Sequence, residues 1–199
     1  MIDESSTTLH RMIATMRSPT LGRYFEQIRA QRQELYDRIA RLPAATIWRR
    51  SGDGHWSVGQ NLEHVNKLVR LFRWLYTIYL PLAVPIARLG RRGPFPVDAE
   101  DVFRRHLPMP PGLGPKDRSN NPTPYEDLRR LLDGELARIV RLLMDLEEDV
   151  AGHIYFWDWL TGPINIQQCM LLSYFHERRH FGFAHRLLDR WLKEAGAGR

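Results

Sequence analysis

The chain has 199 residues, of which 43% are hydrophobic and 26% are charged. This composition is typical of a folded protein, and the length allows one domain with a substantial core, so we predict a single domain over residues 1–199. The net charge is +6, and all but three of the 29 basic residues are arginines scattered along the whole chain. Scattered arginines lack the clustering of a nucleic-acid interface, so we do not expect nucleic acid as a partner.

Three further features narrow the class of protein. Cys169 is the only cysteine, which excludes an intrachain disulfide and a cysteine-rich zinc site. Residues 1–17 contain no apolar run after a basic segment, as a secretory signal would require. The longest apolar stretch, residues 74–87, is too short to span a bilayer and contains two prolines. We therefore expect a cytoplasmic protein without a membrane segment.

The first half of the chain predicts two long amphipathic helices. The first covers residues 19–42 and follows Ser18, a capping residue with proline directly after it. The second covers residues 57–80 and opens with Ser57 and Gln60, the serine and glutamine of a capping box. In each helix apolar residues recur at steps of three and four, which predicts one buried face.

A proline-rich segment follows, over residues 81–122. The stretch from Pro81 to Pro124 holds ten of the thirteen prolines, a density that predicts the end of the second helix at Leu80. A connection of this length is usually functional or disordered. It either covers one end of the helices with its apolar residues or is a solvated crossover, and the sequence favours neither interpretation.

The second half of the chain predicts two more amphipathic helices, over residues 123–149 and 165–194. Both open with residues that can form a capping box, namely Thr123 with Glu126 and Asn165 with Gln168. Four long amphipathic helices predict an all-α fold, a four-helix bundle with a long proline-rich connection between its second and third helices.

Two histidines interrupt the apolar face of the fourth predicted helix. Steps of three and four place His176 and His180 at the centre of a stripe whose other members include Ile166, Cys169, Ser173, Phe183 and Leu187. Buried imidazoles are costly unless they find partners. Two imidazoles one helical turn apart can bind one metal ion, and a third ligand must then come from another element.

His64 is the candidate for the third ligand, because it alone among the other histidines lies in the middle of a long predicted helix. The alternative is that each histidine is hydrogen-bonded separately to a carbonyl or a carboxylate. That alternative needs several polar partners, whereas a metal site needs one ion. The pattern therefore favours a site made of His64, His176 and His180.

The residues around these histidines resemble a known family. The run from Trp56 to His64 (WSVGQNLEH) and the later run from Tyr174 to His180 (YFHERRH) resemble the DinB-like superfamily, also called YfiT-like. The segment from Leu160 to Asn165 is similar to the family's lead-in to its fourth helix. The resemblance extends from Pro19 to about Trp191, but the proline-rich segment has no counterpart in the minimal family pattern.

The resemblance implies a fold, a site and a chemistry. It implies a helical bundle in which His64, His176 and His180 ligate a divalent metal. Several DinB-like proteins are thiol transferases or thiol-dependent isomerases, so it also implies a low-molecular-weight thiol as cofactor. Three imidazoles leave a coordination position for water or substrate, and zinc or nickel is the expected ion.

Several polar residues on or near the apolar faces of the predicted helices need an explanation of their own. Arg32 and Glu135 occupy positions that the pattern reserves for apolar side chains. They either pair with each other, bind an anionic substrate group in a pocket, or extend to water at the bundle edge, and the last is favoured. Gln60 can approach the site from one turn before His64, although its capping role is favoured. Cys169 is interpreted as a core residue rather than as a reactive thiol.

The leading functional hypothesis is a divalent-metal-dependent enzyme that acts on a small molecule, with thiol-dependent S-transfer to a small electrophile as its reaction. The alternative is a non-catalytic bundle that a metal stabilises and that acts through self-association. A homodimer is compatible with both hypotheses, and the sequence does not locate its interface.

Overall fold

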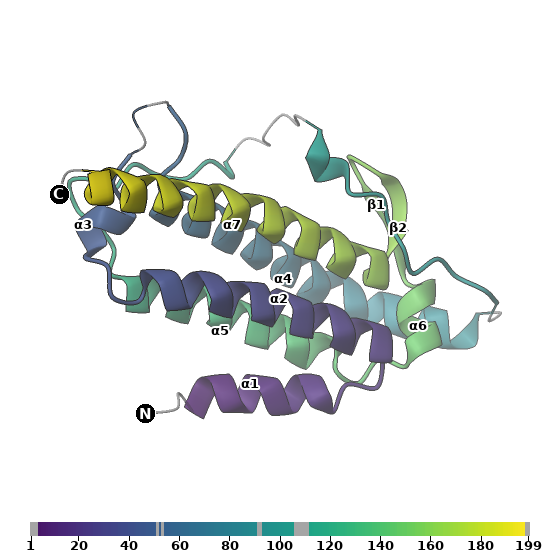
Figure 1. Cartoon of the computed structure of the whole chain (residues 1–199). Helices are drawn as coiled ribbons and strands as arrows, with labels where there is room; N and C mark the ends of the chain where they lie inside the picture. Colours follow the sequence, from purple (N-terminus) through teal and green to yellow (C-terminus); the bar gives the residue numbers. More distant parts are fainter. Residues whose placement is uncertain (1–3, 51, 53, 91–92, 106–111, 198–199) are drawn as a thin grey trace.

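The computed structural model describes residues 4–50, 52, 54–90, 93–105 and 112–197, and it is predominantly helical (Figure 1). This confirms the all-α class. The four long helices are α2 (Pro19–Ile39), α4 (Val58–Leu89), α5 (Tyr125–Leu143) and α7 (Ile166–Ala197). The sequence did not predict the shorter helices α1 (Glu4–Ala14), α3 (Ala44–Ile47) and α6 (Glu148–His153), nor the 3-10 turn η1 (Val102–Arg104).

The four long helices lie side by side. Helix α4 packs against both α5 and α7, and α7 also packs against α2. Helix α1 covers the outer side of α2 and α5 (Figure 1). The apolar faces meet between the helices, where Phe25, Val65, Leu132 and Ile166 are fully buried. Among the described residues, no helix combines the length and apolar character needed to cross a membrane.

The capping residues predicted for three helix starts are confirmed. Ser18 accepts the backbone N–H of Leu21 at 3.2 Å, and its helix begins with proline. Ser57 and Gln60 form the complete reciprocal box. Before α7, the backbone N–H of Asn165 donates to Gln168 and the N–H of Gln168 donates to Asn165. These local hydrogen bonds satisfy helix-end groups that have no partner inside the helix.

The third predicted helix is wrong at both ends. Its N-cap is Pro124 without a side-chain bond, and the carbonyl of Thr123 instead accepts the indole N–H of Trp48 at 2.9 Å. The chain leaves the helix after Leu143, and residues 148–153 form the separate helix α6. Glu148 explains this second start in part, because its carboxylate accepts the Ser18 hydroxyl and the Thr20 N–H.

The second helix does not end at Leu80, as the prolines predicted, but continues to Leu89. Pro81 and Pro85 are exposed and lie four residues apart, so both lost backbone donors lie on one solvent-facing side. On the opposite side, Ala83 and Ala87 are buried. Packing on that side holds the helix together where the backbone pattern is interrupted.

A short hairpin precedes α7, where no strand was expected. Strand β1 (Tyr155–Asp158) pairs antiparallel with β2 (Gly162–Asn165). The turn between them uses Asp158, which accepts the backbone N–H groups of Leu160 and Thr161, and Gly162 has a φ of 79°. The hairpin lies at the start of α7 (Figure 1).

Candidate metal centre

The three predicted histidines meet between two helices. His64 comes from α4, and His176 and His180 come from successive turns of α7. One ring nitrogen from each lies within 4.8 Å of the others. Among the described residues, these three histidines form the group whose potential ligand atoms lie close enough together to share one ion. His64 and His176 are buried and His180 is partly buried.

Hydrogen bonds fix the protonation of two of these rings. The Nδ1 of His64 lies 2.8 Å from the carbonyl oxygen of Leu113, which can only accept, so Nδ1 carries the proton. The Nδ1 of His180 lies 2.9 Å from Oδ1 of Asn61. The amide of Asn61 donates through Nδ2 to the carbonyl of Ser57, which identifies Oδ1 as an acceptor. Both Nε2 atoms therefore carry a lone pair.

The spacing of these nitrogens suits a shared metal ion. The Nε2 atoms of His64 and His176 lie 3.1 Å apart and form a hydrogen bond, in which the Nε2 of His176 donates to the unprotonated Nε2 of His64. Two nitrogens bound to one tetrahedral zinc ion at its usual bond length lie about 3.3 Å apart, so the spacing fits a common ion. A ligating histidine normally donates its other ring N–H to a carbonyl or a side chain, as His64 and His180 do.

The environment keeps the cluster uncharged. Burial is the main cause that lowers the pKa of His64 and lowers that of His176 well below its usual value. Burial together with the neighbouring His64 lowers the pKa of His180 to about 3. Neutral imidazole is the form that binds a metal, so the fold presents three ligands in their competent state at neutral pH.

Aromatic side chains form the walls of the cluster. The Trp56 ring stacks on His180 with centroids 5.6 Å apart and planes 14° apart, and it also contacts His64. The Phe103 ring meets His176 edge to face at 5.1 Å. Apolar walls exclude water and strengthen the electrostatic interactions inside a site.

A small cavity adjoins the cluster beside His176. It has a volume of about 30 Å³, enough for one or two water molecules. Its lining is mostly apolar and comes from α4, the turn η1, the hairpin and α7, through residues that include Phe72, Phe103, Ile164 and Cys169. The site therefore opens onto an apolar space.

The described parts of the proline-rich connection pack on α4 and α7 beside the site, so they are not a free solvated crossover, and they lie over the histidine cluster rather than over one end of the helices. We call residues 93–105 and 112–124 the connecting segment. Helix α4 binds it through Lys67, which donates to the carbonyl of Gly114, and through Glu63, which accepts the N–H of Lys116. Helix α7 binds its other part through Arg178, which pairs with Asp101 at 2.7 Å. Residues 106–111, including His106, lie outside the described residues.

Two residues that the sequence placed near the site have other roles. Gln60 uses its side-chain oxygen to accept the backbone N–H of Ser57, as the favoured capping interpretation predicted. Cys169 is buried and accepts the Tyr76 hydroxyl at 3.0 Å. Burial raises the pKa of Cys169 to about 12, so its thiol is protonated and belongs to the core.

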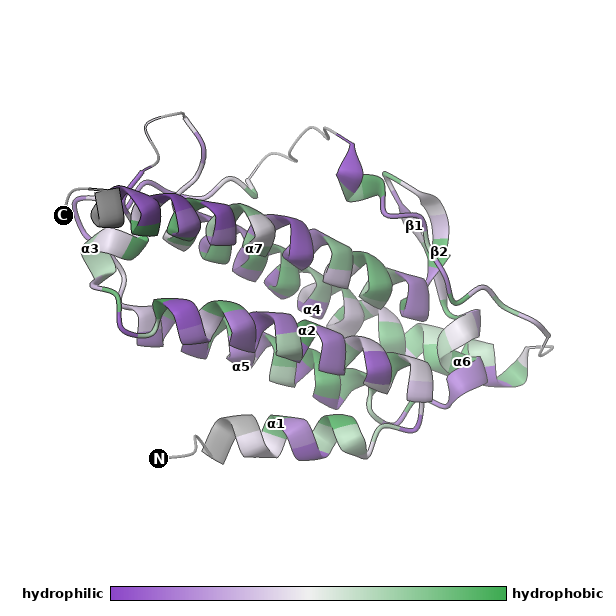
Figure 2. Ribbon diagram, in the orientation of Figure 1, coloured by the Kyte–Doolittle hydropathy of each residue, from purple (hydrophilic) through white to green (hydrophobic). Residues whose placement is uncertain are grey.

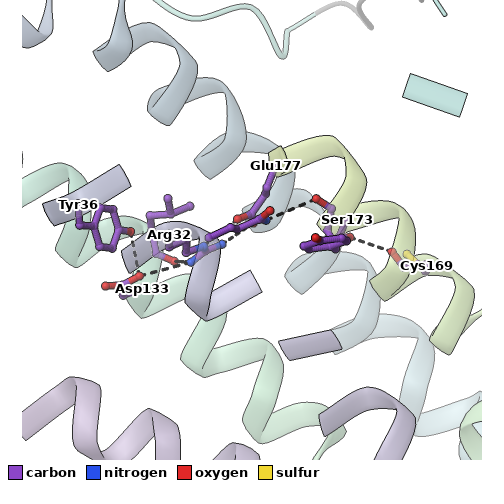
Figure 3. Close-up of polar contacts among 9 residues, drawn as sticks. Arg32, Tyr36, Asp133, Cys169, Ser173 and Glu177 are labelled. Atoms are coloured by element: carbon purple, nitrogen blue, oxygen red, sulfur yellow. Dashed lines mark hydrogen bonds and ion pairs between the residues drawn. The ribbon is translucent and has the colours of Figure 1, made fainter. Parts of the chain in front are cut away.

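Arg32 and Glu135 do not pair with each other, and neither lies at a water-exposed edge. Arg32 is fully buried and binds Glu177 with two hydrogen bonds of 2.9 and 2.5 Å (Figure 3). It also donates to the carbonyl of Leu132 and lies 3.5 Å from Asp133. Glu135 instead pairs with Arg73 at 2.5 Å and with Arg138 at 2.7 Å. The favoured prediction failed because Arg32 and Glu135 each have a partner distant in sequence, Glu177 and Arg73 respectively, that keeps the charge inside the protein.

The sequence also missed residues that orient the ligands. Asn61 precedes His64 by three residues and faces the same side of α4, so its position was a usable signal. Leu113 gave no signal, because it acts through its backbone carbonyl. Glu177, which is adjacent to His176 in the sequence, points towards α2 and binds Arg32.

The fold and the site together define a helical protein that gathers three neutral imidazoles from two helices. The sequence model of the DinB superfamily matches residues 27–184, and the chain belongs to this superfamily. The matched region contains all three histidines and extends from α2 into α7, whereas α1 lies outside it. No match was found among curated proteins or among solved structures.

Proposed function

We propose that the protein is a divalent-metal-dependent enzyme that acts on a small molecule, with His64, His176 and His180 as its metal ligands. In this proposal the four long helices act as a four-helix bundle that holds the ligands. The observation that supports it most strongly is that the rings of His64 and His180 both donate through Nδ1 and turn an unprotonated Nε2 towards the cluster. Zinc and nickel both suit three imidazole ligands.

The residues around the ligands would prepare the site for chemistry. Asn61 and the Leu113 carbonyl hold two rings in position, and Trp56 and Phe103 exclude water. When bound, a divalent ion supplies Lewis acidity that makes a thiolate or a hydroxide available at neutral pH. Because three protein ligands leave a position open, water, thiol or substrate has room to bind.

A thiol-dependent transfer is the reaction class that we propose. Family resemblance supports it, and so does the state of the chain's own cysteine. Because burial raises the pKa of Cys169 to about 12, this residue supplies no thiolate, and the thiol would be a small molecule. The thiol would lose its proton, and its sulfur would form a bond to an electrophilic carbon as that carbon's bond to a leaving group breaks. The apolar cavity beside His176 favours an electrophile with a small apolar group.

Metal content tests the first part of the proposal. The purified chain is reconstituted with zinc or nickel, desalted and measured by elemental analysis, alongside the double variant His176→Ala, His180→Ala. We expect one ion per chain in the parent and none in the variant. His185→Ala is the matched control, because His185 lies on the same helix but contacts Arg38 instead of the cluster. A parent that stays metal-free, or a double variant that keeps its ion, would refute the ligand assignment.

Turnover tests the second part. The metal-loaded chain is assayed with low-molecular-weight thiols and small electrophiles, with and without a chelator, while circular dichroism follows helicity. Loss of turnover with helicity unchanged supports an enzyme. Melting on chelation with no turnover under any condition supports the alternative, a non-catalytic protein that the metal stabilises.

A further inference from the structure

Helix α4 carries an apolar stripe along its second half whose side chains remain largely exposed in the described chain. The stripe has eight large side chains, each between 39% and 89% exposed: Leu71, Trp74, Leu75, Ile78, Tyr79, Leu82, Ile86 and Leu89. In Figure 2 this half of α4 is mostly coloured as hydrophobic. Monomeric proteins rarely expose a continuous apolar patch of this extent unless it binds something.

The same stretch of α4 is also apolar on its other side. Val69, Tyr76, Leu80, Ala83 and Ala87 are buried there, where the helix packs on its neighbours. A helix that is hydrophobic all round is normally buried all round. The outer side is therefore suited to contact with another macromolecule.

The spacing of the stripe indicates what kind of surface fits it. Leu71, Leu75, Ile78, Leu82, Pro85 and Leu89 follow one another at alternating steps of four and three residues. This is the heptad spacing of two helices packed along a common seam. The expected counterpart is therefore another helix with the same repeat, and a second copy of α4 supplies one.

The exposed area is of the order that an interface needs. The eight side chains, six of them Leu or Ile, each expose 39–89% of their surface, which together is on the order of several hundred Å² of apolar area. A standard protein interface buries about 800 Å² per partner. The hairpin extends the patch, because Tyr79 donates its hydroxyl to the carbonyl of Tyr155, and Trp157 on the same strand is exposed.

Charge favours a protein partner over a lipid surface. Helices that lie on membranes have basic side chains available along their polar edge. Here Arg73 pairs with Glu135, and Arg88 lies 3.3 Å from Glu147. Carboxylates of the same chain thus neutralise two of the arginines on this half of α4, which weakens attraction to anionic lipid.

We propose that residues 71–89 of α4 form an isologous interface with a second copy of this chain, in which the two stripes pack along their heptad seams. Because the stripe is made from residues outside the histidine cluster, the interface is independent of the proposed metal chemistry. Each copy presents the same patch to the other, as a two-fold dimer requires.

The mass of the full chain in solution tests this interface. Light scattering during size-exclusion chromatography at micromolar concentration is compared for the parent, for Ile78→Glu with Leu82→Glu, and for Leu192→Glu. Leu192 is the matched control, since it is an exposed leucine on α7, outside the stripe. We expect two chains for the parent and the control and one chain for the double variant, with unchanged helicity by circular dichroism.

Two outcomes would overturn the interface: a parent that elutes with the mass of one chain, and a double variant that still elutes as a dimer. If the parent is monomeric, flotation with vesicles of equal phosphatidylcholine and phosphatidylserine is compared for the parent and the double variant. Flotation of the parent alone would assign the stripe to lipid.

Discussion

His176 and Glu177 are neighbours on α7, and the two residues bury polar groups in opposite ways. The Glu177 carboxylate is paired with Arg32, which binds it with two hydrogen bonds (Figure 3). The Nε2 of His176 instead lies 3.1 Å from the Nε2 of His64, within a cluster of three imidazoles. A buried ion pair holds two helices together, whereas a cluster of neutral imidazoles whose ring nitrogens converge is suited to receive a metal ion.

One helix thus holds the fold together and positions two candidate metal ligands. Adjacent residues of a helix point about 100° apart, so α7 turns Glu177 towards α2 and His176 towards α4. Burial is shared by both residues. The difference is that Glu177 is a charged group bound to an opposite charge, whereas His176 is a neutral group whose ring nitrogen converges with those of His64 and His180.

The largest expected effect concerns the ion pair. Glu177→Leu leaves the Arg32 charge buried without its main partner, so we expect the free energy of unfolding to fall by about 3–5 kcal/mol. The double variant Arg32→Met, Glu177→Leu removes both charges and should regain most of that loss. Urea denaturation measures both variants. Equal losses in the single and double variants would show that the pair itself stabilises the fold.

The next effect concerns metal binding by the histidine cluster. An ion that binds only the folded state raises the free energy of unfolding by about 2.7 kcal/mol when free metal is one hundred times its dissociation constant. We expect this gain for the parent in thermal unfolding with buffered zinc. The variant His176→Ala, His180→Ala should show none, and an equal gain in that variant would place the ion elsewhere.

A smaller effect concerns the orientation of His180. Asn61→Ala removes the acceptor of its Nδ1 proton, and losses of this kind lower metal affinity about 10- to 100-fold. Asn61→Asp keeps an acceptor oxygen for the Nδ1 proton but loses the amide donor to the Ser57 carbonyl, so its affinity should fall less than that of the alanine variant. Competition with a chromogenic chelator measures the dissociation constants. If the alanine and aspartate variants bind alike, the hydrogen bond does not orient the ligand.

The smallest effect is a pH dependence outside the site. Hydrogen bonds from Ser18 and Thr20 hold the pKa of Glu148 below its usual value, although burial opposes them. Its contribution to stability is therefore complete above the unfolded pKa of about 4.3 and is lost as the pH falls through the lower folded value. Glu148→Gln should cost less than about 1 kcal/mol at pH 7, because the group is partly solvated. In urea denaturation, the difference from the parent should vanish at acid pH.

Local sequence signals predicted three of the helix starts correctly. Ser18, Ser57 and Asn165 identified three helix starts because a cap acts over three residues. The histidine cluster was also predictable, since His176 and His180 lie on one face of α7. Its assignment as a metal site remains a prediction, as does the single domain over residues 1–199.

Long-range features were not predictable from pattern alone. The partner of Arg32 lies 145 residues away, and no local periodicity reports such a contact. Pro81 was expected to end α4, but burial of Ala83 and Ala87 on the far side overrides the local preference. The hairpin before α7 was missed because its strands have four residues each, too few to show alternation.

Side chains of the surrounding elements hold the connecting segment largely through its backbone carbonyls, and this affects which substitutions the segment tolerates. Tyr24 donates to the carbonyl of Val97, Asn165 to that of Pro96 and Gln168 to that of Asp98, while His64 donates to that of Leu113. Every residue type has a backbone carbonyl, so these contacts survive substitution of the residues that supply them. Side chains along the connecting segment can therefore vary without releasing the segment from the helices.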